Sequence, residues 1–102
     1  MPPPLLHQIA HDGSRQFAEL PESRSWAALR DHLADLPGVR ITQFLTDHIT
    51  EVWIDFAYQG HTFSVNNPSG EYLFFVTPAD CPEDILTVVV AHCHPFLHEG
   101  DA

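Results

Sequence analysis

The sequence predicts an α+β two-layer sandwich, in which two helices cover one face of a four-stranded antiparallel meander. Two segments with helix start signals and helical apolar spacing lie near residues 23–35 and 80–93. Four segments with strand-like alternation lie between them, and their short connections favour sequential antiparallel pairing. At 102 residues the chain fits a single domain, which we place at residues 23–102, preceded by an arm or hairpin at residues 1–22.

The N-terminal arm starts with the stiff segment "MPPP" and then carries a turn signal. "LLHQIAH" and "RQFAEL" flank the triplet Asp12-Gly13-Ser14. This arrangement is compatible with an extra N-terminal hairpin and also with an irregular arm.

The first helix is expected to begin at Ser23 or Ser25 and to run to about Asp35, because serine is a favoured N-cap residue. Pro37-Gly38 then ends it. Arg30 lies at the edge of the apolar stripe, where its aliphatic stem can cover the core. The stripe itself consists of Trp26, Leu29 and Leu33.

The four strands are predicted from alternation of apolar and polar residues. The second has the clearest alternation, and Gln59-Gly60 after it predicts a two-residue hairpin loop, with glycine supplying a positive φ. Further turns are expected at Asp47-His48 and at residues 67–70. The strands are predicted at residues 39–46, 50–58, 61–66 and 71–77.

The second helix is predicted to start at Asp80, which forms a capping box with Glu83, while Pro82 lies in the first turn. It is apolar over a wide arc and should be mostly buried. Cys81 and Cys93 are expected to be free thiols, because both fall in this helix and are twelve positions apart, beyond bonding reach.

The Gln59-Gly60 loop determines which residues of the two central strands lie opposite each other. Phe56 should pair with Phe63, and Ile54 with Val65, on the face under the helices. The other side of the sheet is called the open face below. It should carry Trp53, Asp55, Ser64 and Asn66.

The last strand can join in two registers. One register pairs Val65 with Leu73, and it is the one we predict. It brings Tyr72 and Phe74 onto the open face. A shift by one residue would bring Leu73 and Phe75 there instead. In both registers the open face holds at least three large apolar or aromatic groups, which is unusual for a monomer.

Three explanations for such a face stay open. The N-terminal arm, residues 5–22, could fold over it. A second copy of the chain or another protein could cover it, since Trp and Tyr often anchor interfaces. A small-molecule pocket could also form there. The predicted binding residues are Trp53, Asp55, Ser64, Asn66, Tyr72 and Phe74.

Three histidines, His92, His94 and His98, cluster in "AHCHPFLH" near the end of the chain. On a continuous helix His92 and His94 would point about 200° apart. If the helix ended at Cys93, a new turn from Pro95 could bring the three together as zinc ligands. The alternative is a helix end at which the dipole favours histidine. The sequence therefore predicts no cofactor, and zinc is the one alternative that it leaves open.

The charge of the chain restricts its partners. The net charge is −10, and the only Lys or Arg residues are four arginines. Nucleic acid and anionic membranes are therefore not expected as partners. No segment has the roughly 20 apolar residues of a membrane span, and the start lacks the features of a signal peptide, so we expect a cytoplasmic protein.

The segment "WIDFAYQGHTFSVNNPSGEYLFFV", followed by "CPEDIL", resembles a small family of uncharacterised bacterial proteins. The resemblance covers roughly the second half of the chain, mostly strand and turn positions. It implies a single bacterial cytoplasmic domain, and it implies no catalytic residue, because the family has no assigned activity.

Among functions, the sequence favours a non-enzymatic interaction module over an enzyme. It contains no phosphate-binding glycine motif and no nucleophile elbow. We expect the open face to form a homodimer or to bind a protein partner, preferably a basic one. The alternatives are a zinc-binding protein that uses the histidine cluster and a small-ligand binder that uses the open face.

Overall fold

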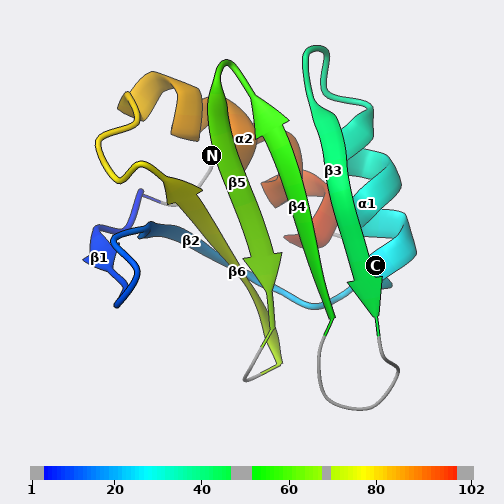
Figure 1. Cartoon of the computed structure of the whole chain (residues 1–102). Helices are drawn as coiled ribbons and strands as arrows, with labels where there is room; N and C mark the ends of the chain where they lie inside the picture. Colours follow the sequence, from blue (N-terminus) through cyan, green and yellow to red (C-terminus); the bar gives the residue numbers. More distant parts are fainter. Residues whose placement is uncertain (1–3, 47–51, 68–69, 99–102) are drawn as a thin grey trace.

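Six antiparallel strands form one sheet, against which two helices pack, in a computed structural model that describes residues 4–46, 52–67 and 70–98. The strands lie in the order β1-β2-β6-β5-β4-β3 (Figure 1). The elements are β1 (Gln8–Ile9), β2 (Arg15–Pro21), α1 (Trp26–Ala34), β3 (Arg40–Thr46), β4 (Val52–Tyr58), β5 (His61–Asn66), β6 (Glu71–Thr77) and α2 (Glu83–His98).

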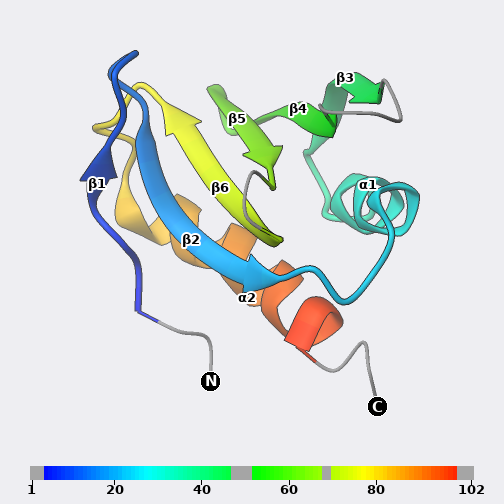
Figure 2. The same ribbon diagram turned by 90° about the horizontal axis from the view of Figure 1, so that it is seen from below.

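The predicted α+β class is confirmed, and the two helices lie on the same side of the sheet (Figure 2). Their apolar residues form one core with the inward-facing residues of the strands, as expected for a two-layer domain. The largest fully buried members are Tyr72, Phe17, Phe56, Phe63, Phe74, Leu20, Leu29, Leu33, Ile54, Leu86 and Leu97.

The sheet has six strands because the N-terminal segment forms the hairpin that the sequence left open. Asp12 accepts hydrogen bonds from the backbone N–H and the hydroxyl of Ser14, at 3.0 and 2.6 Å, and so holds the turn. β2 lies between β1 and β6, with Phe17 fully buried. The N-terminal segment therefore contributes to the same core as residues 23–98.

Helix α1 begins as predicted. Ser25 is its N-cap, and the Ser25 hydroxyl accepts a hydrogen bond from the Ala28 N–H at 3.1 Å. Ser23, the other candidate cap, instead donates its hydroxyl to the carbonyl of Leu97 in α2. The stripe residues Leu29 and Leu33 are both fully buried.

The β4–β5 hairpin has the predicted register. Tyr58 pairs with His61, and Phe56 with Phe63. Gln59 and Gly60 have φ values of 53° and 79°, as a type I′ turn requires. The turn predicted at Asp47-His48 lies outside the described residues, as do Pro68 and Ser69 of the turn predicted at residues 67–70.

The predicted register of the last strand is wrong. Val65 pairs with Phe74, and Phe63 with Val76, which is the alternative shifted by one residue. Tyr72 and Phe74 therefore point into the core, where they are 0% and 1% exposed. The energetic reason is that this register buries three large side chains of β6 under the helices, whereas the predicted one would bury two.

Helix α2 differs from prediction at both ends. It starts at Glu83, and the Leu86 N–H donates to the carbonyl of Pro82, so Cys81 precedes the helix. Cys81 and Cys93 are free and buried, as expected. The helix continues through Pro95 to His98 and does not end at Cys93. No helix in the described part of the chain is long and apolar enough to cross a membrane.

Candidate functional site

The open face is built from rows of cross-strand neighbours, because directly paired residues in antiparallel strands project to the same side. In the middle row the pairs run from β2 to β3 as Gln16, Phe75, Ser64, Asp55 and Gln43. A second row contains Glu19, Leu73, Asn66 and Trp53, and a third contains Thr77, Thr62, Ala57 and Arg40.

Three large apolar side chains lie close to the centre of this face. Trp53, Leu73 and Phe75 are each partly exposed, whereas every core-facing residue of β6 is buried. Both helices lie on the other side of the sheet, so neither covers these three residues (Figure 2). The predicted patch therefore exists, with Leu73 and Phe75 in place of Tyr72 and Phe74.

Acidic side chains lie beside the three apolar residues. Asp55 lies in the middle row, and Glu19 pairs with Leu73. Glu71, at the start of β6, shares a hydrogen bond with Glu19, and this bond together with the charge of Glu19 raises the pKa of Glu71. Two carboxyl groups held this close favour a cationic partner, which would relieve their repulsion.

A hollow of about 390 Å³ opens on the open face beside β5 and β6. Its floor consists of Ser64, Asn66, Phe75 and Thr77, and its rim of four residues around the β1–β2 turn, Ala10, His11, Asp12 and Ser14. The Oδ1 atom of Asn66 is buried and has no hydrogen-bond partner among the described residues. A buried acceptor of this kind costs free energy until a donor reaches it.

The N-terminal arm borders the open face and does not fold over it. Residues 15–21 form a strand within the sheet, and only the turn at residues 10–14 reaches the hollow. The first explanation for the aromatic patch, burial under the arm, is therefore wrong for Trp53 and Leu73. His11 and Asp12 were missed as rim residues, because the triplet Asp12-Gly13-Ser14 signals a turn but not where that turn lies.

One member of the histidine cluster, His92, lies in a contact between the two helices. The rings of His32 in α1 and His92 in α2 stack with centroids 4.0 Å apart. The Nε2 atom of each ring is hydrogen-bonded to the backbone carbonyl of the other, at 2.7 and 2.6 Å. Phe96 also stacks on His32, at 4.0 Å, and the Arg24 guanidinium lies 4.7 Å from the centre of the Phe96 ring.

This arrangement removes the geometry on which the zinc site depended. Because α2 is continuous through Pro95, His92 and His94 project about 200° apart around its axis. His92 is engaged with His32, and the side chain of His98 lies outside what the structure describes. Among the described residues, no three His, Cys, Asp or Glu side chains are grouped so that they could hold a metal ion.

Of the six residues predicted for the sheet site, the structure brings four together. Trp53, Asp55, Ser64 and Asn66 share the open face. In the sequence of β6, Leu73 and Phe75 are as apolar as Tyr72 and Phe74, so alternation alone could not identify the exposed pair.

No protein-family model matches the chain, and comparison with curated proteins and with solved structures finds no significant match to either.

Proposed function

We propose that this protein is a non-enzymatic interaction module, whose open face binds a cationic amphipathic helix of a partner protein. The observation that carries the proposal is the grouping of Trp53, Leu73 and Phe75, each partly exposed, on the sheet face that neither helix covers, beside Asp55 and Glu19. Apolar residues at the centre with polar residues around them are the usual anatomy of a protein interface.

A helix is the element best suited to cover this face. Sheets in two-layer and three-layer domains bury their apolar faces under helices, and in the described part of this chain both helices pack on the other face. Apolar side chains of the incoming helix would contact Trp53, Leu73 and Phe75. Its lysines or arginines would lie near Asp55, Glu19 and Glu71.

Charge favours such a helix over a second copy of the chain. Two copies would each bring a net charge of −10, and the acidic side chains of their open faces would lie near each other. Like charges placed opposite each other across an interface oppose association. A cationic partner is attracted by the negative charge of the chain, and this attraction also raises the rate of association.

The proposal is tested with a synthetic amphipathic peptide that has leucine at helical spacing and lysine at its other positions. A second peptide carries glutamate in place of lysine. Titration followed by calorimetry and by amide NMR shifts should show binding of the lysine peptide only. The affinity should fall as salt is added, because exposed charges are screened.

Three variants locate the binding surface. Phe75→Ser should weaken binding about tenfold or more, since a large apolar anchor is lost. Asp55→Asn should weaken it about two- to fivefold through charge alone. Val88→Ser is the matched control, because Val88 is an exposed apolar residue, 41% accessible, on α2. Equal effects of the Phe75 and Val88 variants, or equal binding of both peptides, would contradict the proposal. So would a homodimer that Phe75→Ser dissociates.

A further inference from the structure

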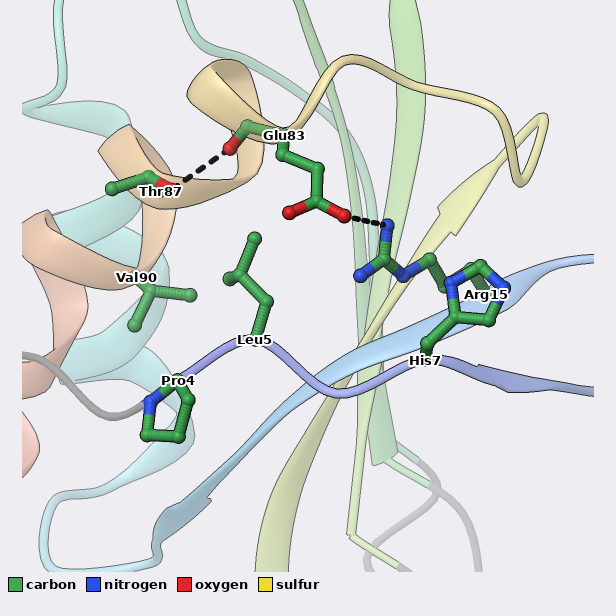
Figure 3. A pocket seen from close by; sticks show the side chains of 7 residues that line it. All are labelled: Pro4, Leu5, His7, Arg15, Glu83, Thr87 and Val90. Atoms are coloured by element: carbon green, nitrogen blue, oxygen red, sulfur yellow. Dashed lines mark hydrogen bonds and ion pairs between the residues drawn. The ribbon is translucent and has the colours of Figure 1, made fainter.

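A second hollow lies away from the open face, between the N-terminal segment and helix α2 (Figure 3). Its volume is about 570 Å³, which is within the range of small-molecule sites. Seven residues line it: Pro4, Leu5, His7, Arg15, Glu83, Thr87 and Val90.

Arg15 gives this hollow a buried positive charge. Its side chain is 4% exposed, although the chain has only four Lys or Arg residues in all. The Arg15 Nε–H donates to the Leu6 carbonyl at 2.9 Å, and one terminal nitrogen lies 3.4 Å from a carboxylate oxygen of Glu83. Within the described structure these are its two hydrogen bonds, whereas a guanidinium has five N–H donors.

Glu83 is a loose partner for that charge. Its side chain is 69% exposed, and 3.4 Å is longer than the 2.7–2.9 Å of a strong charge-assisted hydrogen bond. Figure 3 shows Glu83 reaching from the first turn of α2 toward Arg15. A buried guanidinium with so weak a counter-charge leaves a desolvation cost that a better-placed anion would offset.

The remaining walls indicate what else the ligand carries. Pro4, Leu5 and Val90 are apolar, and Leu5 extends toward α2 beside the Arg15–Glu83 pair (Figure 3). The hydroxyl of Thr87 donates to the Glu83 carbonyl at 2.8 Å, so its hydrogen is already used within the helix. A ligand with one anionic group and an apolar chain would satisfy both parts of the hollow.

Charge distinguishes a carboxylate from a phosphate here. Arg15 supplies one positive charge, the adjacent Glu83 is negative, and the chain carries −10 overall. A phosphate, with close to two negative charges, would be opposed by this field more than a carboxylate with one. A carboxylate also matches the planar fork of the guanidinium in a bidentate contact.

We propose that this hollow binds a small organic monocarboxylate with an apolar chain. Its carboxylate takes the position of the Glu83 carboxylate on Arg15, and its chain lies against Leu5 and Val90. This site is separate from the open face, so the proposal does not depend on whether the open face binds a partner helix.

The probes are hexanoate, its neutral amide hexanamide, and inorganic phosphate, titrated into the full chain at constant ionic strength. Amide NMR shifts of Leu6, Thr87 and Val90 report on the site. Hexanoate should produce saturable shifts at these amides, and hexanamide and phosphate should not. Equal binding of hexanoate and hexanamide, tighter binding of phosphate, or no saturable shift with hexanoate would overturn the proposal.

Variants test the roles of the two charged residues. Glu83→Gln removes the competing carboxylate from an exposed position, so it should keep the fold and tighten hexanoate binding about fivefold. Arg15→Gln should abolish the binding, and Arg30→Gln, at a half-exposed arginine paired with Asp31, is the matched control that should leave it unchanged. If Arg15→Gln fails to fold, hexanoate binding by the Glu83→Gln variant alone tests the proposed site. Unchanged or weaker hexanoate binding by Glu83→Gln would refute the site.

Discussion

Replacing Phe74 and Phe75 separately by alanine tests the register of β6, on which the composition of the open face depends. Phe74 is 1% exposed, and its ring makes an edge-to-face contact with Phe17, with centroids 6.1 Å apart. Phe75 is partly exposed on the opposite side of the sheet. The two substitutions remove the same atoms from adjacent positions, so any difference between them reports on the environment.

The expected magnitudes follow from burial. Emptying a fully buried phenylalanine site costs about 3–5 kcal/mol in the free energy of unfolding. Phe74→Ala should therefore remove about a fifth or more of the roughly 5–15 kcal/mol that stabilises a domain of this kind. Phe75→Ala loses only part of its burial and leaves no enclosed cavity, so about 1 kcal/mol is expected.

The assay is urea unfolding followed by circular dichroism, with the slope m checked for constancy between variants. If Phe74→Ala leaves too little folded protein, Phe74→Leu provides a milder test, with an expected loss of about 1–2 kcal/mol. The register would be refuted if the Phe75 variant were the more destabilised, since that result would place Phe75 in the core and Phe74 on the open face.

Three further predictions concern the turn, the helix contact and the thiols. Gln59→Asn should raise the free energy of unfolding by up to about 1 kcal/mol, because Gln59 has a φ of 53° and asparagine tolerates this conformation better than glutamine does. A lower urea midpoint for the variant would contradict this. Burial lowers the pKa of His32 below its ordinary value of 6.5, so the unfolded chain binds a proton at this histidine more readily than the folded chain does. The neutral His32 side chain therefore contributes to the free energy of unfolding above pH 6.5, and this contribution is lost as the pH falls below that value. His32→Gln should therefore flatten the decline of the urea midpoint between about pH 7.5 and pH 5.5, and an unchanged decline would contradict this account of His32. Burial raises the pKa of the Cys93 thiol to about 12, and Cys81 is also buried. A thiol reagent should therefore modify the two cysteines of the native protein only as fast as the protein unfolds. Rapid reaction of either cysteine without denaturant would contradict the described core.

The sequence was sufficient for the class of the fold and for most element positions, because local signals were strong. The predicted bounds of residues 61–66 and 71–77 are those of β5 and β6. The Gln59-Gly60 turn is short enough to determine its own register, so the face assignment of Trp53 and Asp55 followed correctly.

Other features depend on tertiary contacts that a single sequence does not display. β6 has apolar residues on both of its faces, so only the packing of the helices determines that Tyr72 is buried and Leu73 is not. In β2 the bulge between Gln16 and Ala18 interrupts the alternation that identifies a strand. Pro95 stays within α2, where the neighbouring Phe96 stacks on His32 and Leu97 is buried, and these contacts offset the lost backbone hydrogen bond.

The position of β2 in the sheet has a consequence for how the chain reaches its fold. Arg15 pairs with Val76 and Pro21 with Glu71, so a strand near the start of the chain is held by one near its end. Pairings of such high contact order form late and slow folding, whereas β4, β5 and β6 are joined by short turns and can assemble first. During synthesis Phe17 and Leu20 emerge long before their neighbours on β6 exist. We therefore expect the growing chain to expose these residues until β6 has been synthesised, which makes β2 a segment in need of protection from aggregation.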